Sequence, residues 1–279
     1  MSDYSLLLDK LRETKPLVHH ITNYVTVNDC ANITLAIGAS PVMADAIDEA
    51  ADIAGIAGAA VLNMGTLNER TIPSMIAAGK AANAKGIPVI FDPVGAGASR
   101  LRNETAAKII NGVKLSVIRG NISEIRFIAG LSSNTKGVDA SASDIAGADS
   151  AKETAKNLAQ KLDCVVVISG AVDTVSDGKK TISINNGHPM LGNLTGTGCM
   201  CSSLIGSFCG AIFAARGEAA SNEYLSAAAA AMLCMGIAGD IAFEKAGHLG
   251  NGSFRAALHD AVSRMDSKTI EKLAKYSEE

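Results

Sequence analysis

Short apolar runs alternate with longer amphipathic segments from residue 16 to residue 169. Buried strands of a parallel sheet are predicted by the β-branched runs at 16–22, 59–64, 87–92, 115–119 and 164–169. Segments of helical length lie between them, at 46–57, 68–85, 102–112 and 151–162. This alternation is typical of βαβ units with helices on both faces of the sheet, and it predicts an α/β fold.

A different pattern follows residue 169. Residues 174–185 form two alternating segments around Ser176-Asp177-Gly178, which predicts a β-hairpin at the edge of the sheet. From Thr197 onward the pattern is helical, and the runs 199–215 and 225–239 fall just short of the roughly 18–20 apolar residues that span a membrane. Neither run has a flanking aromatic belt or basic cluster, so both are interpreted as buried core helices. No linker or repeat divides the chain, and one domain over 1–279 is predicted.

The amino-acid composition argues against several classes of protein. With 48% hydrophobic and 19% charged residues, the chain is too apolar to be disordered. A net charge of −3 without a long basic run argues against a protein that binds nucleic acid or anionic membranes. The six cysteines show no framework spacing, and residues 1–15 lack the apolar core of an export signal. These features predict a cytoplasmic protein with free thiols.

Polar and glycine residues collect directly after the predicted strands, at positions 23, 63–65, 92–97, 119–121 and 169–170. Ligands of open α/β sheets bind beyond the carboxyl ends of the strands. We therefore expect the chemistry of this protein at that edge of the sheet.

The strongest local signal is the segment 193–199, in which two glycines precede an apolar helix. Glycine lets the backbone turn sharply, and the first N–H groups of the helix would then form a site for a phosphate or a developing anion. A plain capped helix start with Thr197 as N-cap is the alternative interpretation. Cys199 lies in the first turn, where the helix dipole should lower the pKa of its thiol. Walker A and complete GxGxxG motifs are absent, which argues against P-loop and Rossmann nucleotide sites.

A second set of residues suits a metal–phosphate complex. Asp92 ends one predicted strand, and Asn121 and Glu124 follow another, so carboxylate and amide oxygens that suit Mg²⁺ are available. The spacing Asn-x-x-Glu is also that of a helix capping pair. Arg119 could grip a nucleotide phosphate with its fork of donors, or it could form a surface ion pair.

Several blocks of this sequence together resemble the hydroxyethylthiazole kinase family. They stand in the family's order: PLVHHITN at 16–23, LAIGASPVM at 35–43, VLNMGTL at 61–67, DPVG at 92–95, RGNISE at 119–124, NGHP at 186–189 and TGTGC at 195–199. The resemblance implies a three-layer ribokinase-like fold with a mostly parallel central sheet flanked by helices. It also implies a homotrimer with active sites at the subunit interfaces. The implied reaction transfers the γ-phosphate of ATP, with Mg²⁺, to the hydroxyl of 4-methyl-5-(2-hydroxyethyl)thiazole in thiamine salvage.

The same resemblance implies roles in binding the two substrates. Met43 and Gly196 would contact the thiazole, and Asn23 would lie near it. Arg119 and Ser169 would bind ATP. Many relatives are expected to carry threonine where this chain has Ser169, a departure that keeps the hydroxyl group.

Further residues would belong to the reacting centre. The resemblance implies that Asp92 and Glu124 serve the Mg²⁺–phosphate region and that Cys199 lies beside the reacting hydroxyl. We expect the N–H groups around Gly196 to Cys199, those of Thr197 and Gly198 included, to hold the migrating phosphoryl group together with Mg²⁺, as an oxyanion hole would. Phosphoryl transfer depends mainly on positioning and charge stabilisation, so Cys199 would orient the alcohol and accept its proton late. The wider ribokinase-like group usually has aspartate at this position.

Three alternatives to this hypothesis differ in their chemistry. A kinase of the same fold could act on another small alcohol, such as a hydroxymethylpyrimidine or a sugar. A thiol enzyme could use Cys199 as a covalent nucleophile, with His188 as the only histidine close to it in sequence. An anion-binding sensor would keep the glycine-rich loop but would not need the carboxylates at 92 and 124.

Overall fold

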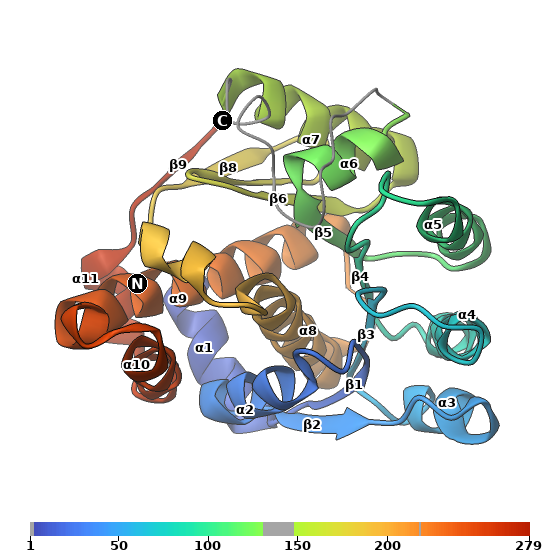
Figure 1. The fold of residues 1–279 in the computed structure, drawn as a ribbon, viewed down its shortest axis with the longest axis horizontal. Helices are drawn as coiled ribbons and strands as arrows, with labels where there is room; N and C mark the ends of the chain where they lie inside the picture. The colour runs from blue at the N-terminus through green and yellow to red at the C-terminus, as the bar shows by residue number, and fades with distance from the viewer. Residues whose placement is uncertain (1–2, 131–147, 218) are drawn as a thin grey trace.

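The computed structural model describes residues 3–130, 148–217 and 219–279, and within these ranges nine strands form one sheet (Figure 1). The sheet order is β2-β1-β3-β4-β5-β6-β7-β8-β9. The strands are β1 (Leu17–Ile21), β2 (Ser40–Met43), β3 (Ala59–Asn63), β4 (Val89–Asp92), β5 (Val117–Asn121), β6 (Val165–Ser169), β7 (Asp173–Ser176), β8 (Thr181–Ile184) and β9 (Tyr276–Glu278). The pairs from β2 to β6 are parallel and those from β6 to β9 are antiparallel.

Helices cover both faces of this sheet, so the predicted three-layer arrangement is confirmed. One layer contains α3 (Ile47–Ala54), α4 (Thr71–Ala84), α5 (Arg100–Gly112), α6 (Ile122–Ile128) and α7 (Ala148–Leu162). The other layer contains α1 (Asp3–Thr14), α2 (Val27–Ile37), α8 (Thr197–Arg216), α9 (Ser221–Ala246), α10 (Asn251–Ser263) and α11 (Ser267–Leu273). Short 3₁₀ turns, η2 (Pro189–Asn193) and η3 (Gly247–Leu249), precede α8 and α10.

The five predicted strands correspond to β1, β3, β4, β5 and β6, but the sheet continues beyond them. Strand β2 was not predicted, because its four residues are only half-buried and include Pro41. The hairpin of β7 and β8 turns at the predicted place. Its expected position at the sheet edge is wrong, because β9 pairs with β8 and takes that edge. The pairing joins the C-terminal segment to the sheet and could not be read from local pattern.

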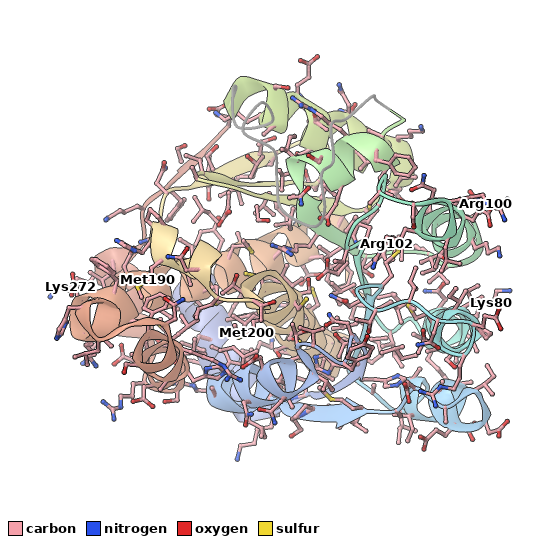
Figure 2. All side chains as sticks on the ribbon, in the orientation of Figure 1. Lys80, Arg100, Arg102, Met190, Met200 and Lys272 are labelled. Atoms are coloured by element: carbon pink, nitrogen blue, oxygen red, sulfur yellow. The ribbon has the colours of Figure 1, made fainter. Side chains whose placement is uncertain are left out.

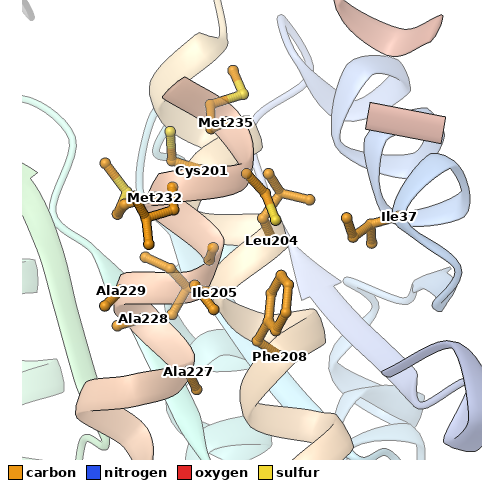
Figure 3. Packing of buried hydrophobic residues seen from close by; sticks show 14 of the residues in the cluster. Ile37, Cys201, Leu204, Ile205, Phe208, Ala227, Ala228, Ala229, Met232 and Met235 are labelled. Carbon is orange, nitrogen blue, oxygen red and sulfur yellow. The ribbon is translucent and has the colours of Figure 1, made fainter. Parts of the chain in front are cut away.

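Helices α8 and α9 form the apolar centre of one layer. By length and composition both could cross a membrane, yet 78% and 83% of their apolar windows are buried inside the protein. Figure 3 shows Leu204, Ile205 and Phe208 of α8 interdigitated with the alanines and methionines of α9. Burial against the sheet and against each other accounts for the apolar composition of these two helices.

Glycine at position 206 lets α8 approach the sheet closely. A Cβ atom there would lie 2.6 Å from Cγ2 of Val61 in β3 and 3.2 Å from Cγ1 of Val18 in β1. The side chains that would have to move belong to buried strands, so the surrounding core has little room to adjust. The position of α8 on the sheet, and hence of its first turn, depends on this contact.

We expect Gly206→Ala to lower the free energy of unfolding by about 1–3 kcal/mol, because overpacking forces the core to shift. Urea denaturation measures the change. Gly252→Ala, in helix α10 with no atom within 4 Å of the added Cβ, is the matched control and should be neutral or stabilising. Equal effects of the two substitutions would contradict the close-packing argument.

Candidate active site

The carboxyl ends of the parallel strands meet the first turn of α8. Asn63 and Asp92, the last residues of β3 and β4, are register partners, and so are Asn121 and Ser169 at the ends of β5 and β6. Side chains at matched positions of neighbouring parallel strands lie on the same face of a sheet. The structure therefore brings the predicted strand-end residues together at one edge.

Helix α8 begins with Gly196 in the N-cap position, at a φ of +88°. Thr197 was an alternative N-cap, and this interpretation is wrong: its hydroxyl donates to the carbonyl of Leu191 at 3.2 Å instead. No side chain caps the helix, and within the described residues no acceptor bonds the amides of Thr197, Gly198 and Cys199. Free amides at the positive end of a twenty-residue helix form an anion site.

The sulfur of Cys199 lies between two amide side chains. Nδ2 of Asn23 donates to Sγ at 3.3 Å, and Nδ2 of Asn63 donates to it at 3.2 Å. Burial, together with the nearby carboxylate of Asp92, raises the pKa of the Cys199 thiol. The expected lowering of this pKa is therefore wrong, because burial removes the thiolate from water and the carboxylate of Asp92 repels it. A thiol with a raised pKa keeps its proton at neutral pH, so little thiolate is available to act as a base.

Asp92 lies at the centre of the polar network. The residue is fully buried, and its Oδ2 accepts from Nδ2 of Asn63 and from the hydroxyl of Ser202, both at 2.8 Å. Nη1 of Arg119 lies 3.9 Å from the same oxygen. Burial raises the pKa of Asp92, while Arg119 opposes the shift. Its other oxygen, Oδ1, has no partner among the described residues, although it is buried.

Arg119 joins the strand ends to the start of α8. Its Nη2 donates to Oγ of Ser169 at 2.7 Å, and its guanidinium lies so close to Gly198 that a Cβ there would overlap Nη1. Arg119 is only 9% exposed, so the alternative of a surface ion pair is wrong. The ion pair with Asp92 is buried, and it places a fixed positive charge beside the free amides of α8.

Glu124 is held by the backbone on both of its oxygens. Oε1 accepts from the amide of Gly95 at 2.7 Å, and Oε2 accepts from that of Asn121 at 2.8 Å. Oδ1 of Asn121 accepts in return from the amide of Glu124, so the pair forms the capping box of α6. Burial and the nearby Asp92 raise the pKa of Glu124 to about 7. The helix-capping interpretation is thus correct, and it also fixes a carboxylate near Asp92.

The residues implied to bind the thiazole come from β2, from the segment after β1 and from the N-cap of α8. Met43 ends β2 and is the register partner of His20 in β1, one strand further from Asp92. Oδ1 of Asn23 accepts from the amide of Thr26 at 3.1 Å. A Cβ on Gly196 would lie 2.7 Å from Cγ2 of Thr26, so glycine is needed here for space as well as for its backbone angle.

Three residues of this network were given no role by the sequence. Asn63 was noted only as a strand end, although it bonds both Asp92 and Cys199. Ser202 lies one turn along α8, where helical spacing could have placed it on the face of Cys199. Arg102 donates to the carbonyls of Met64 at 2.6 Å and Val94 at 2.5 Å, and no local signal reveals this clamp. Figure 2 shows Arg102 pointing inward from α5, whereas Arg100 points outward.

The fold is that of a ribokinase-like kinase. The chain shares its fold with pyridoxal kinase from Staphylococcus aureus in complex with AMP-PCP and pyridoxal, at a TM-score of 0.59 and 12% identity over 94% of this chain and 98% of that one. A structure of hydroxyethylthiazole kinase protein from Pyrococcus horikoshii matches at a TM-score of 0.88 and 37% identity, over all of both chains.

Sequence comparison identifies the family. The hydroxyethylthiazole kinase family model matches residues 8–268. Hydroxyethylthiazole kinase from Ruminiclostridium cellulolyticum is 57% identical over 100% of both chains, and the protein of that name from Clostridium beijerinckii is 57% identical over 98% of this chain and 96% of its own. The chain belongs to the hydroxyethylthiazole kinase family. The fold, family and enzyme class predicted from the sequence are confirmed.

The pKa of Glu124 predicts how its contribution to stability depends on pH. The pKa rises from 4.5 to about 7 on folding, so between these values the folded protein holds a proton that the unfolded chain has released. The stabilisation from this residue is therefore present at low pH and is lost as pH rises through about 7. Glutamine cannot ionise. The unfolding free energy of Glu124→Gln relative to wild type should thus increase between about pH 5 and about pH 8, by roughly 1–3 kcal/mol.

Urea denaturation at several pH values measures this difference. Glu153→Gln, which removes an exposed carboxylate from α7, is the control and should give a difference that does not change with pH. A pH-independent difference for Glu124→Gln would contradict the burial argument.

Proposed function

We propose that this chain transfers the γ-phosphate of ATP to the hydroxyl of 4-methyl-5-(2-hydroxyethyl)thiazole, and that the edge described above is its active site. The observation that carries the proposal is the start of α8, where unbonded amides lie beside the buried guanidinium of Arg119. Membership of the hydroxyethylthiazole kinase family supports the thiazole alcohol as acceptor. The product would be the thiazole phosphate used in thiamine salvage, and we infer that the reaction takes place in the cytoplasm.

The amides of Thr197, Gly198 and Cys199 hold the migrating phosphoryl group in this mechanism. Phosphoryl transfer passes through a loose transition state with its charge spread over the equatorial oxygens, so positioned donors contribute most of the catalysis. Arg119 adds a fixed positive charge, and Ser169, bonded to it at 2.7 Å, keeps the guanidinium oriented toward ATP. These donors are ordered by the fold before the substrate binds.

Mg²⁺ fits the carboxylates of this edge. Oδ1 of Asp92 is buried without a described partner, which suits a cation ligand. Both oxygens of Glu124 already accept backbone amides, so Glu124 is suited to hold a metal-bound water rather than the ion itself. Mg²⁺, when bound, would neutralise charge on the phosphates of ATP. Asp92 and Glu124 would hold it in place.

Cys199 positions the acceptor alcohol. Its raised pKa keeps the sulfur protonated, so the thiol orients the alcohol and cannot take up the alcohol's proton without losing its own. Met43, Gly196 and Asn23 would form the thiazole side of the site. Tyr24 and Val25, which follow Asn23, are 77% and 55% exposed in the single chain, which supports a homotrimer with subunits meeting beside the site.

The alternatives gain little support from the geometry. A covalent thiol enzyme needs a base beside Cys199, whereas His188 accepts from the amide of Met190 and stacks on Phe243 with ring centroids 3.4 Å apart. Another small alcohol as acceptor remains the second candidate, because fold neighbours include pyridoxal kinases. Substrate competition separates these possibilities.

The deciding experiment incubates the purified protein with Mg-ATP and the hydroxyethylthiazole and measures thiazole phosphate by mass spectrometry. Pyridoxal, a hydroxymethylpyrimidine and a sugar alcohol are assayed in parallel. We expect the highest kcat/KM with the thiazole. A higher value with any other acceptor would overturn the proposed substrate, and ATP-independent chemistry would overturn the kinase.

Asp92→Asn tests the metal site. The substitution keeps an oxygen acceptor but removes the charge, so the Mg²⁺ concentration that gives half-maximal activity should rise by about tenfold or more. ADP release is followed while Mg²⁺ is titrated, and circular dichroism checks the fold, because Arg119 loses its buried partner. Glu153→Gln should leave the titration unchanged. An unaltered Mg²⁺ dependence in Asp92→Asn would remove Asp92 from the metal site.

Cys199→Ala tests whether the sulfur orients the alcohol or acts as an early base. Loss of a general base usually costs about 10²–10⁴-fold in rate, so an orienting role predicts a decrease in kcat below about 100-fold. The KM for ATP should stay near that of wild type, as determined by steady-state kinetics. A larger loss of kcat would restore Cys199 as the base, and no loss would remove it from the mechanism.

A further inference from the structure

Asn63 uses all of its hydrogen-bonding groups inside the site. Its Oδ1 accepts from the amide of Gly65 and from Nδ2 of Asn23, both at 2.9 Å. Its Nδ2 donates to Oδ2 of Asp92 at 2.8 Å and to Sγ of Cys199 at 3.2 Å. An amide has two donors and two acceptor positions, so no group of Asn63 is left for a substrate.

The orientation of this amide is fixed by the backbone. The Gly65 amide can only donate, so the atom of Asn63 that faces it must be the oxygen, and the nitrogen must face Asp92 and Cys199. The Thr26 amide fixes the Asn23 side chain in the same way. Both Nδ2 groups that reach Sγ are thus donors by necessity.

The turn after β3 does not explain why position 63 is an amide. An aspartate would accept from Gly65 and Asn23 equally well, because both contacts use an oxygen. It would, however, place a second carboxylate against Asp92 and leave Cys199 with one donor fewer. The chemistry of the side chain is therefore matched to Asp92 and Cys199 rather than to the turn.

We propose that Asn63 is a positioning residue for the acceptor alcohol, which it controls by fixing Sγ of Cys199 against the carboxylate of Asp92. This inference rests on the proposed function. Donors from Asn23, after β1, and from Asn63, at the end of β3, hold the sulfur in place, which fixes the direction that it presents to the substrate hydroxyl. Asn63 also links the metal-binding carboxylate to the group that orients the alcohol, and it does so without touching either substrate.

Two substitutions separate this role from a structural one. Asn63→Ala removes every contact, whereas Asn63→Asp keeps the two contacts of the oxygen, removes both donors and adds a second carboxylate beside Asp92. If Asn63 acts only in the turn, Asn63→Ala should lower the free energy of unfolding but leave kcat unchanged. If it positions Cys199, both variants should lower kcat by about tenfold or more while the KM for ATP stays within about twofold. In the Cys199→Ala background, Asn63→Ala should cause little further loss of kcat, because it acts through the sulfur.

A second readout does not need turnover. Iodoacetamide alkylation of Cys199 is measured by peptide mass spectrometry from neutral to alkaline pH; the other five cysteines are buried. Donors to the sulfur favour the thiolate, so Asn63→Ala should move the midpoint of this profile upward by about one pH unit, and the added carboxylate of Asn63→Asp should move it further. Asn83→Asp, at an asparagine that bonds both backbone groups of Lys114 away from the site, is the control and should change nothing.

The outcomes are distinct. Wild-type kcat and an unchanged alkylation profile in Asn63→Asp would overturn the inference, and so would a loss of kcat in both variants with an unshifted profile. If Asn63→Ala does not fold, Asn63→Asp carries the test, since it retains the turn. If the profile shifts but wild type phosphorylates no thiazole alcohol, the proposed function fails while the control of Cys199 by Asn63 stands.

Discussion

The site depends on one buried charge. Asp92 is fully buried, and a carboxylate in that position is tolerable only because Asn63, Ser202 and Arg119 surround one of its oxygens. These three partners come from β3, α8 and β5. Satisfying the charge therefore links β4, which carries Asp92, to β3, β5 and the start of α8, and removing it would leave Arg119 buried without its counter-charge. The other oxygen of Asp92 is buried and has no hydrogen-bond partner in the part of the chain that the structure describes.

Glycine makes the required approach of α8 possible. Gly196 adopts a left-handed backbone angle at the N-cap and lies against Thr26. Gly198 has no Cβ atom, which leaves room for the guanidinium of Arg119. Further along the same helix, Gly206 lies against Val61 and Val18 of the sheet. Because these glycines have no side chains, the helix can lie closer to Thr26, to Arg119 and to the sheet. The free amides end up beside a positive charge because the backbone has no Cβ atoms in the way.

Burial is the largest influence on the pKa values of the acidic groups in this site. The carboxyls of Asp92 and Glu124 and the thiol of Cys199 all have raised pKa values, and in each case loss of water is the largest cause. A phosphoryl-transfer site gains from such an environment, because fixed donors act more strongly where water is excluded. The same environment makes a thiol base unfavourable and an orienting thiol suitable.

The sequence by itself determined those features of this protein that depend only on neighbouring residues. Alternating strands and helices, the strand-end polar residues and the glycines before Cys199 could all be identified from residue type and spacing. Thr197 could not be excluded as a cap, because its hydroxyl bonds Leu191 of η2. Arg119 could not be placed in the interior, because its partners Asp92 and Ser169 lie on other strands. The bond of Asn63 to Cys199 and the pairing of β8 with β9 also join segments that are distant in the sequence. Hydrogen-bond partners and burial are properties of the packed chain, so only the tertiary structure decided which polar residues became a site.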